Sequence, residues 1–347
     1  MTAAQTIETS PAPRQLQRPT RQLTALLRRR ETLLIALMAI VIAISTGAHP
    51  YFWAAGNFGS ILADSMVITL LALGETFVML GRGIDLSVGV IMGLAAITVG
   101  FQIQDHGMTL LPALFLGAAV GVALGIGNAL LVAAMRLPPI IATLGTLGVY
   151  SGLEFVVTNG NQVNTIPNEF TNLASNQVLP GIPEIFLYSL PLILIAALVL
   201  RHTVFGRSVY AVGDDAESAY RAGIPVRRVL FATYVIAGLL SGLAGVVFLI
   251  YTSGASATTG VNDNLTAIAA ALIGGTALTG GRGGAFGALV GSVFLTLTLT
   301  AMSFFPEISD VWQPAGVGVL VLLAVLSDRR ARQANFTARP RLRRLFR

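Results

Sequence analysis

Carboxylates inside apolar segments are the side chains of this sequence with the clearest capacity for chemistry. Asp64 and Glu75 lie 11 residues apart in one apolar run, and since a helix turns by about 100° per residue, both carboxyl groups lie on nearly the same helix face. Glu154 lies near the outer end of a later run. Acidic groups are costly inside a membrane and are candidates for function by default. The pattern allows a relay of protons or cations, but we favour hydrogen bonds between helices.

Most other reactive side chains are missing from the sequence. The 347 residues contain no cysteine, and all 22 basic side chains are arginine, without a single lysine. This composition excludes thiolate metal sites, cysteine nucleophiles, a P-loop lysine and Schiff-base chemistry. The three histidines are far apart in the sequence and suggest no metal site. We therefore expect no enzyme activity and no catalytic, metal-binding or cofactor-binding residue in this chain.

The composition identifies the environment in which these residues must be positioned. The chain is 54% hydrophobic and only 11% charged, its mean hydropathy is +0.76, and a soluble domain carries about 25% charged residues. The sequence therefore predicts an all-α membrane protein. The net charge of +6 comes from arginines beside apolar segments, which indicates membrane orientation rather than nucleic-acid binding.

Ten apolar runs are long enough to be membrane-spanning helices, since a span takes roughly 20 residues, or fewer where neighbours shield its ends. They cover approximately residues 32–49, 58–80, 86–101, 110–134, 138–157, 185–200, 229–250, 265–280, 284–303 and 313–327. The glycine- and alanine-rich eighth run predicts a short or broken helix, which is tolerated only inside protein or beside a cavity. Closely spaced glycines, such as Gly117, Gly121 and Gly125, predict close packing between helices.

The arginines predict the orientation of these spans. If the amino terminus is inside, the five outer segments contain no arginine at all: residues 48–57, 102–109, 158–184, 251–264 and 304–312. By the positive-inside rule, both termini are cytoplasmic. We expect a disordered basic tail over residues 1–30, a transmembrane domain over residues 31–328, and a second basic tail over residues 329–347 that lies on anionic lipid.

The longest inner connection, residues 201–228, carries a helix signature. Asp214 is placed to act as N-cap with Glu217 three residues later, Gly223 stands where a left-handed residue ends a helix, and Pro225 prevents continuation. The pattern predicts a short helix over about residues 215–222. Its small apolar face consists of Ala216, Ala219 and Tyr220. Such a short helix is marginal alone, so it docks either under its own transmembrane domain or, as we favour, in a cleft of a cytoplasmic partner.

Polar residues near the inner ends of other spans have two interpretations each. Asp85 and Ser87 follow a glycine turn and are expected to cap a helix start, with ligand contact as the alternative. Pro138 and Pro139 suit the first turn of the next helix. Thr143 and Thr146, on one side of that helix, either line a polar path or bond back to the backbone. The candidates for a translocation path are therefore Asp64, Glu75, Asn128, Thr143 and Thr146.

Four segments, taken in order, resemble a known family. They are GRGIDLSVGV, PPIIATLGTL, YAVGDDAESAYRAGIPVRRV and AIAAALIGGTALTGGRGGAFGALVG, and their order and spacing are similar to those of membrane-spanning permease subunits of ribose-type (monosaccharide) ATP-binding-cassette importers. The similarity covers about residues 35–330. The sequence departs from the family at Gly213-Asp214-Asp215, where relatives commonly show Gly-Gly-Asn, and at Arg82, where many have Gly.

The resemblance implies a cobalamin-importer-type fold of about ten transmembrane helices in the bacterial cytoplasmic (inner) membrane. It also implies a second permease subunit, identical or paralogous, a soluble extracytoplasmic sugar-binding protein, and an ATPase subunit that binds ATP and Mg²⁺. The helix of the 201–228 loop would be the coupling helix that contacts the ATPase. The coupling residues would be Asp214, Asp215, Glu217, Ala219, Tyr220, Arg221 and Gly223.

The expected function is import of a monosaccharide or similar small polyol, with ATP hydrolysed by the partner chain. Two alternatives stay open at the level of sequence. Branched-chain amino acids, nucleosides, cyclitols and furanosyl signal molecules are carried by similar permeases. An ion-coupled secondary transporter would be favoured only by Asp64 and Glu75.

Overall fold

The computed structural model describes residues 30–305 and 312–337. Within these ranges the chain is almost entirely helical, and the described strands are a small hairpin, β1 (Gln177–Leu179) and β2 (Ile182–Pro183). The predicted tails lie largely outside the described residues. The last helix continues past the predicted boundary at residue 328, because it ends at Thr337.

Each of the ten predicted apolar runs coincides with a helix. These helices are α2 (Arg30–Ala48), α3 (Ala55–Leu80), α4 (Val88–His106), α5 (Leu110–Ala129, extended by the π-helical turn η2, Leu130–Ala134), α6 (Pro139–Thr158), α8 (Glu184–His202), α11 (Val226–Thr252), α12 (Asp263–Ile273), α13 (Ala285–Ser303) and α14 (Gln313–Thr337). Seven of the described helices are long and apolar enough to cross a membrane; α2, α12 and α14 contribute shorter apolar stretches. The chain is therefore a multi-pass membrane protein.

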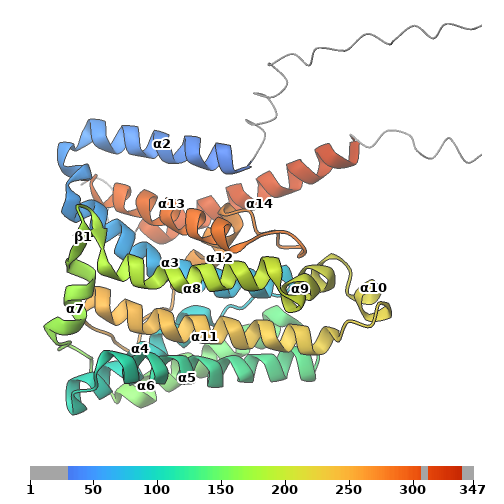
Figure 1. Cartoon of the computed structure of the whole chain (residues 1–347), viewed down its shortest axis with the longest axis horizontal. Helices are drawn as coiled ribbons and strands as arrows, with labels where there is room; N and C mark the ends of the chain where they lie inside the picture. Colours follow the sequence, from blue (N-terminus) through green and yellow to red (C-terminus); the bar gives the residue numbers. More distant parts are fainter. Residues whose placement is uncertain (1–29, 306–311, 338–347) are drawn as a thin grey trace, which may run out of the picture.

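The long helices run side by side as one bundle (Figure 1). Helix α3 lies at its centre and is buried along nearly its whole length, in contact with α11, α13, α12 and α8. By contrast, α5 and α6 expose many large apolar side chains, including Phe115 and Val156. In a soluble protein such surfaces would be a liability, but here they match the hydrocarbon of a bilayer or another subunit.

Glycines bring α5 and α11 into direct backbone contact. A Cβ at Gly121 would lie 2.1 Å from the carbonyl oxygen of Gly238, and one at Gly242 would lie 2.1 Å from that of Gly117. No larger side chain fits there, since the obstacle is backbone. The predicted packing role of this glycine series is therefore confirmed.

Two other local predictions are confirmed. Helix α6 begins at Pro139 with Pro138 as its N-cap, consistent with the fixed backbone angle of proline in a first turn. Helix α12 is short, with 11 residues, and the glycine-rich residues 274–284 continue from it without helix to α13. The alanines before Gly274 lie inside the helix, whereas the glycines of this run, from Gly274 on, lie where the helix has ended.

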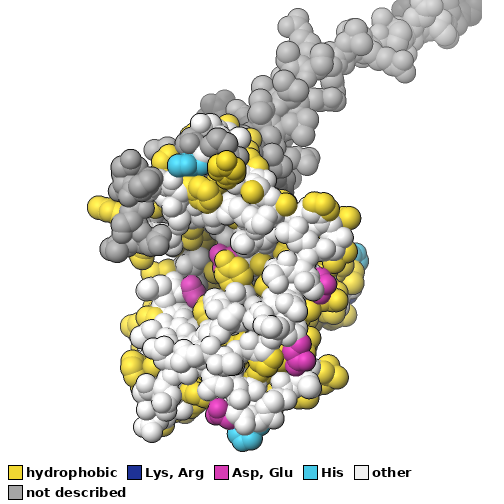
Figure 2. Space-filling model, turned by 90° about the vertical axis from the view of Figure 1, so that its left-hand side faces the viewer, with side chains coloured by type: hydrophobic (Ala, Val, Ile, Leu, Met, Phe, Trp, Pro, Cys, Tyr) yellow, Lys and Arg dark blue, Asp and Glu magenta, His cyan; other side chains and the backbone are white. Residues whose placement is uncertain are grey.

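The short elements gather at the two opposite ends of the bundle (Figure 1). One end carries η1 (Pro50–Trp53), α7 (Asn168–Ser175) and the hairpin, whereas the other carries α9 (Val204–Asp214) and α10 (Ala216–Arg221). Figure 2 views the first end, and its described surface shows acidic and histidine side chains but no arginine. The charge asymmetry predicted from sequence is thus present in the folded molecule.

Candidate functional site

The segment after α8 folds into two short helices in succession. Thr203 is the N-cap of α9, and its Oγ1 accepts a hydrogen bond from the Gly206 N–H at 3.0 Å. The sequence reading missed α9, because its glycine-containing stretch carries no long apolar run. Helix α10 follows directly after it and is the helix that the capping pattern predicted.

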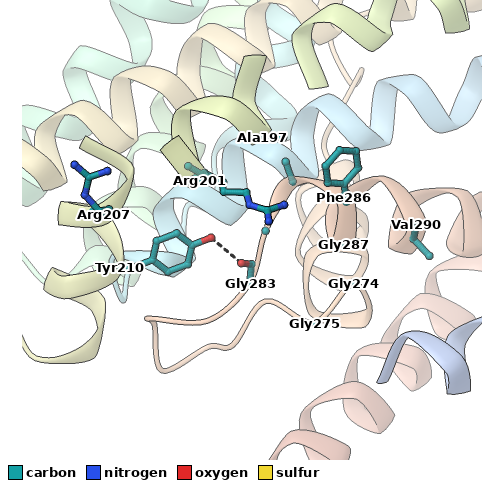
Figure 3. A pocket seen from close by; sticks show the side chains of 13 residues that line it. Ala197, Arg201, Arg207, Tyr210, Gly274, Gly275, Gly283, Phe286, Gly287 and Val290 are labelled. Carbon is teal, nitrogen blue, oxygen red and sulfur yellow. Dashed lines mark hydrogen bonds between the residues drawn. The ribbon is translucent and has the colours of Figure 1, made fainter. Parts of the chain in front are cut away.

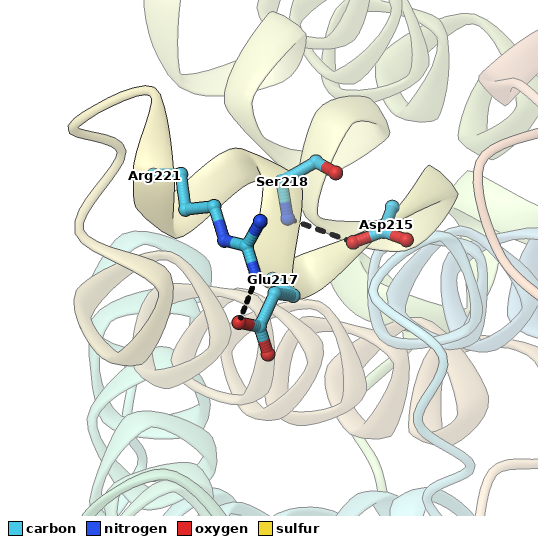
Figure 4. A network of polar contacts seen from close by, with 4 residues as sticks. All are labelled: Asp215, Glu217, Ser218 and Arg221. Atoms are coloured by element: carbon cyan, nitrogen blue, oxygen red, sulfur yellow. Dashed lines mark hydrogen bonds and ion pairs between the residues drawn. The ribbon is translucent and has the colours of Figure 1, made fainter.

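The prediction of Asp214 as the N-cap of this helix is wrong by one residue. Asp214 is the last residue of α9, and Asp215 takes the extended conformation of an N-cap, accepting a hydrogen bond from the Ser218 N–H at 2.7 Å (Figure 4). Because α9 runs up to Asp214, that residue is already helical and cannot cap. The hydrogen bond from Ser218 lowers the pKa of the Asp215 carboxyl below its usual value.

The remaining charged residues of α10 lie on its free surface. Instead of closing a capping box, Glu217 pairs with Arg221 one turn later, at 2.9 Å (Figure 4). Gly223 has φ +83°, and the N–H of the next residue, Ile224, bonds back to the carbonyl of Ala219. The predicted left-handed helix end is therefore confirmed.

The predicted apolar face of α10 does not act as one unit. Ala219 is buried within the protein's own core, whereas the ring of Tyr220 is 73% exposed. Ala219 therefore anchors the helix to its own domain, whereas docking of Tyr220 in a partner stays a prediction. An exposed tyrosine flanked by charges is typical of a contact surface for another protein.

Arg82 ties this segment to two other loops. From the turn between α3 and α4, its Nε donates to the carbonyl oxygens of Gly213 at 2.7 Å and of Thr279 at 2.9 Å, and its terminal nitrogen donates to the carbonyl of Asp214. The same junction is closely packed, because a Cβ at Gly213 would meet the carbonyl of Leu80. The sequence reading noted Arg82 only as a departure from the family. Its φ of +67° lies in the left-handed region, which glycine adopts most readily.

The α3–α4 turn also contains a buried polar network. Asp85 accepts hydrogen bonds from the N–H and hydroxyl of Ser87 at 2.9 and 2.7 Å, and from the amide of Asn128 at 3.0 Å. Its own N–H lies 3.2 Å from a carboxyl oxygen of Glu75. Asp85 thus satisfies one backbone N–H, that of Ser87, which is the N-cap of α4, but the Ser87 side chain makes no cap bond to the first N–H groups of the helix. The network fixes the turn that carries Arg82.

Of the path candidates, Asp64 lies apart, whereas Glu75, Asn128 and Thr143 all contact the α3–α4 turn. The hydroxyl of Thr143 bonds to the carbonyls of Ile84 and Pro139, and that of Thr146 bonds to Thr143, so both threonines bond to backbone as one interpretation had it. Asp64 lines a cavity of about 310 Å³ together with Asp263. Since 11 residues of helix span roughly 16 Å, Asp64 and Glu75 belong to separate polar sites.

The fold and this site define an integral membrane subunit with a protruding helix pair at its basic end, suited to contact another protein. The sequence profile of the family described as "Branched-chain amino acid transport system / permease component" matches residues 57–326. The chain belongs to this permease family, and it is a transport subunit rather than an enzyme.

Individual relatives match over most of their length. The chain is 36% identical over 309 residues to the "Autoinducer 2 import system permease protein LsrC" of Enterobacter sp. (strain 638), covering 89% of each chain. It is 35% identical over 294 residues to the "Probable ABC transporter permease protein y4mJ" of Sinorhizobium fredii, covering 85% of this chain and 87% of that protein. No solved structure matches the chain significantly.

Proposed function

We propose that this chain forms the translocation path of an ATP-driven, binding-protein-dependent importer in the cytoplasmic membrane of a bacterium. The observation that carries the proposal is the α9–α10 unit at the arginine-bearing end. It exposes Glu217, Tyr220 and Arg221 outward and is held inward by Arg82 and Ala219. A helix that is both exposed and anchored transmits a partner's movement to the bundle.

The partner at α10 is, in this proposal, an ATP-binding-cassette ATPase that binds ATP and Mg²⁺. A second copy or a paralogue completes the translocation path, and a soluble binding protein delivers the ligand at the end that carries α7. This arrangement needs ten spans with both termini cytoplasmic. It is supported by the coincidence of the ten apolar runs with helices and by the arginine-free surface at the α7 end.

The ligand is proposed to be a monosaccharide-like small polar molecule. The names of the relatives that match about nine-tenths of this chain include autoinducer 2, whereas the family description names branched-chain amino acids. We favour the ligand class of the full-length relatives, because they match the whole bundle. Uptake of labelled autoinducer 2, ribose and leucine tests this preference between ligand classes. It is measured in intact cells of the source bacterium that lack the chromosomal copy of the gene.

A matched pair of glycine variants tests the coupling role. Gly223→Val should abolish uptake with normal expression, because a β-branched residue cannot adopt φ +83° without strain. Gly160→Val is the control, since Gly160 has φ +79° and, like Gly223, nothing within 4 Å of an added Cβ, but lies at the opposite end. Equal uptake by the two variants would contradict the coupling role. Uptake that persists without any ATPase and collapses with the proton gradient would establish an ion-coupled transporter instead.

A further inference from the structure

A cavity of about 830 Å³ opens at the arginine-bearing end of the bundle, away from α10. Its walls are the last turns of α8, one face of α9, and the glycine-rich loop with the first turns of α13 (Figure 3). Neither the coupling role nor the polar turn between α3 and α4 accounts for it. Its volume is that of a site for a small organic ligand.

The mouth of the cavity is positively charged. Arg201 reaches from the end of α8 toward Gly283 (Figure 3), and among the described residues its guanidinium has no carboxylate or carbonyl partner. Arg207 lies on α9 beside the cavity, where its guanidinium donates a long hydrogen bond, of 3.5 Å, to the carbonyl of His202. No acidic side chain is among the described lining residues. A free guanidinium in such a place is suited to a phosphate group.

The loop opposite the arginines reinforces this preference for an anion. Helix α13 begins at Ala285, and its N-cap Gly284 offers no side chain to the first N–H groups of the helix. Gly283, Gly284 and Ala285 all line the cavity, so the positive end of the helix faces it. The hydroxyl of Tyr210 donates to the carbonyl of Gly283 at 2.8 Å (Figure 3) and holds the loop in place.

The cavity becomes apolar toward the membrane. Ala197 lies one turn before Arg201 on α8, and Val290 lies five residues inside α13, so both lie roughly 6–8 Å deeper along their helices than the mouth. Both helices are long and apolar enough to cross a bilayer. A soluble anion would use only the mouth of such a site, whereas a lipid would use its whole depth. The two terminal segments are poor occupants, because both are rich in arginine.

We propose that this cavity binds one anionic phospholipid, with the headgroup phosphate at Arg201 and the acyl chains against Leu200, Phe286 and Val290. Basic pockets between helices at the membrane boundary favour such headgroups, and each arginine contributes to the attraction. A bound lipid would join α8, α9 and the α12–α13 loop, and therefore stabilise the fold.

Thermal unfolding of the purified full-length protein in neutral detergent tests the proposal, with the two tryptophans as reporters and native mass spectrometry to count retained lipids. Phosphatidylglycerol should raise the midpoint more than phosphatidylcholine. In Arg201→Gln the phosphatidylglycerol concentration for half-maximal stabilisation should rise about five-fold. Val290→Trp fills the apolar part of the cavity and leaves the charge of Arg201 unchanged, and it should weaken the retention of phosphatidylglycerol. Arg136→Gln, the same change at the inner end of another span, should leave both readouts unchanged.

Three outcomes would overturn the proposal. The first is equal stabilisation by the two lipids, and the second is full retention of phosphatidylglycerol by Arg201→Gln. The third is protection by glycerol phosphate, which lacks acyl chains, as large as that by phosphatidylglycerol, because the site would then belong to a soluble phosphate. None of these readouts depends on transport, so they test the lipid site independently of the proposed importer function.

Discussion

Arg82 shows how one residue can link distant parts of this chain. A left-handed backbone costs a non-glycine residue roughly 1–2 kcal/mol, and Arg82 offsets this cost by donating to carbonyls of α9, the α9–α10 junction and the α12–α13 loop. Its side chain is exposed, so each of these bonds contributes only about 1 kcal/mol. The three bonds together exceed the backbone cost by only about 1–2 kcal/mol, so the main benefit of Arg82 is the linkage rather than global stability.

The variant Arg82→Gly should consequently change the free energy of unfolding by no more than about 2 kcal/mol. We expect amide hydrogen exchange in α10 and in residues 274–284 to accelerate clearly, because their common anchor is lost. Arg136→Gly is the matched control: Arg136 has φ +61°, and its guanidinium has no partner among the described residues. The control variant should leave the free energy of unfolding unchanged or raise it slightly, and amide hydrogen exchange in α10 should not change. Equal acceleration in both variants would contradict the anchoring role.

Asp215 makes the start of α10 sensitive to acid. In the folded protein the pKa of the Asp215 carboxyl is lowered. Its carboxylate therefore stabilises the start of α10 fully above the unfolded pKa of about 3.9, and this stabilisation is lost as pH falls through the lowered folded pKa. Exchange of the Ser218 N–H should therefore increase, relative to the intrinsic rate, only in strong acid. Asp215→Ala should show the increase at neutral pH, whereas Asp215→Asn, which keeps a capping oxygen, should not. Protection of Ser218 in the alanine variant would rule out the cap.

Among the elements, α5 and α11 depend most strictly on residue size. Gly121→Ala should lower the unfolding midpoint by many degrees, a loss of several kcal/mol, because the added methyl meets the Gly238 carbonyl and two backbones must separate. Gly145→Ala on α6 is the control, since nothing lies within 4 Å of its added Cβ, and it should gain up to about 1 kcal/mol from helix propensity. Similar midpoints for the two variants, measured in one detergent, would contradict close packing at α5 and α11.

The sequence predicts those elements whose cause is local. Apolar composition predicts the ten apolar helices, seven of which are long enough to cross a membrane, and the glycine–proline pattern predicts the end of α10, since both depend on neighbouring residues. The N-cap was misplaced because it depends on where α9 ends, and α9 carries no long apolar run. The role of Arg82 and the cavity that Asp64 shares with Asp263 depend on residues about 130 to 200 positions away, which no local pattern contains.

At the scale of the whole molecule, charge divides the bundle into two unlike ends. The described arginine side chains lie at the ends of helices near α9 and α10, while the opposite surface, with α7 and the hairpin, shows none (Figure 2). Such a distribution orients a membrane protein with its arginines inside. In the proposed orientation, α10 would lie where ATP is available and the arginine-free end would meet a ligand from outside.

Single cysteines test this orientation directly, because the natural chain has none. Asn161 follows α6 at the arginine-free end, and Ser218 lies on α10; both are exposed, so the replacements should not disturb the fold. In intact cells an impermeant maleimide should label Asn161→Cys at once and Ser218→Cys only after the membrane is opened. Labelling of both from the same side would mean an even number of crossings between them and would contradict the ten-span arrangement. Labelling in the reverse order would keep the crossings but invert the protein, and the proposed direction of transport would fail with it.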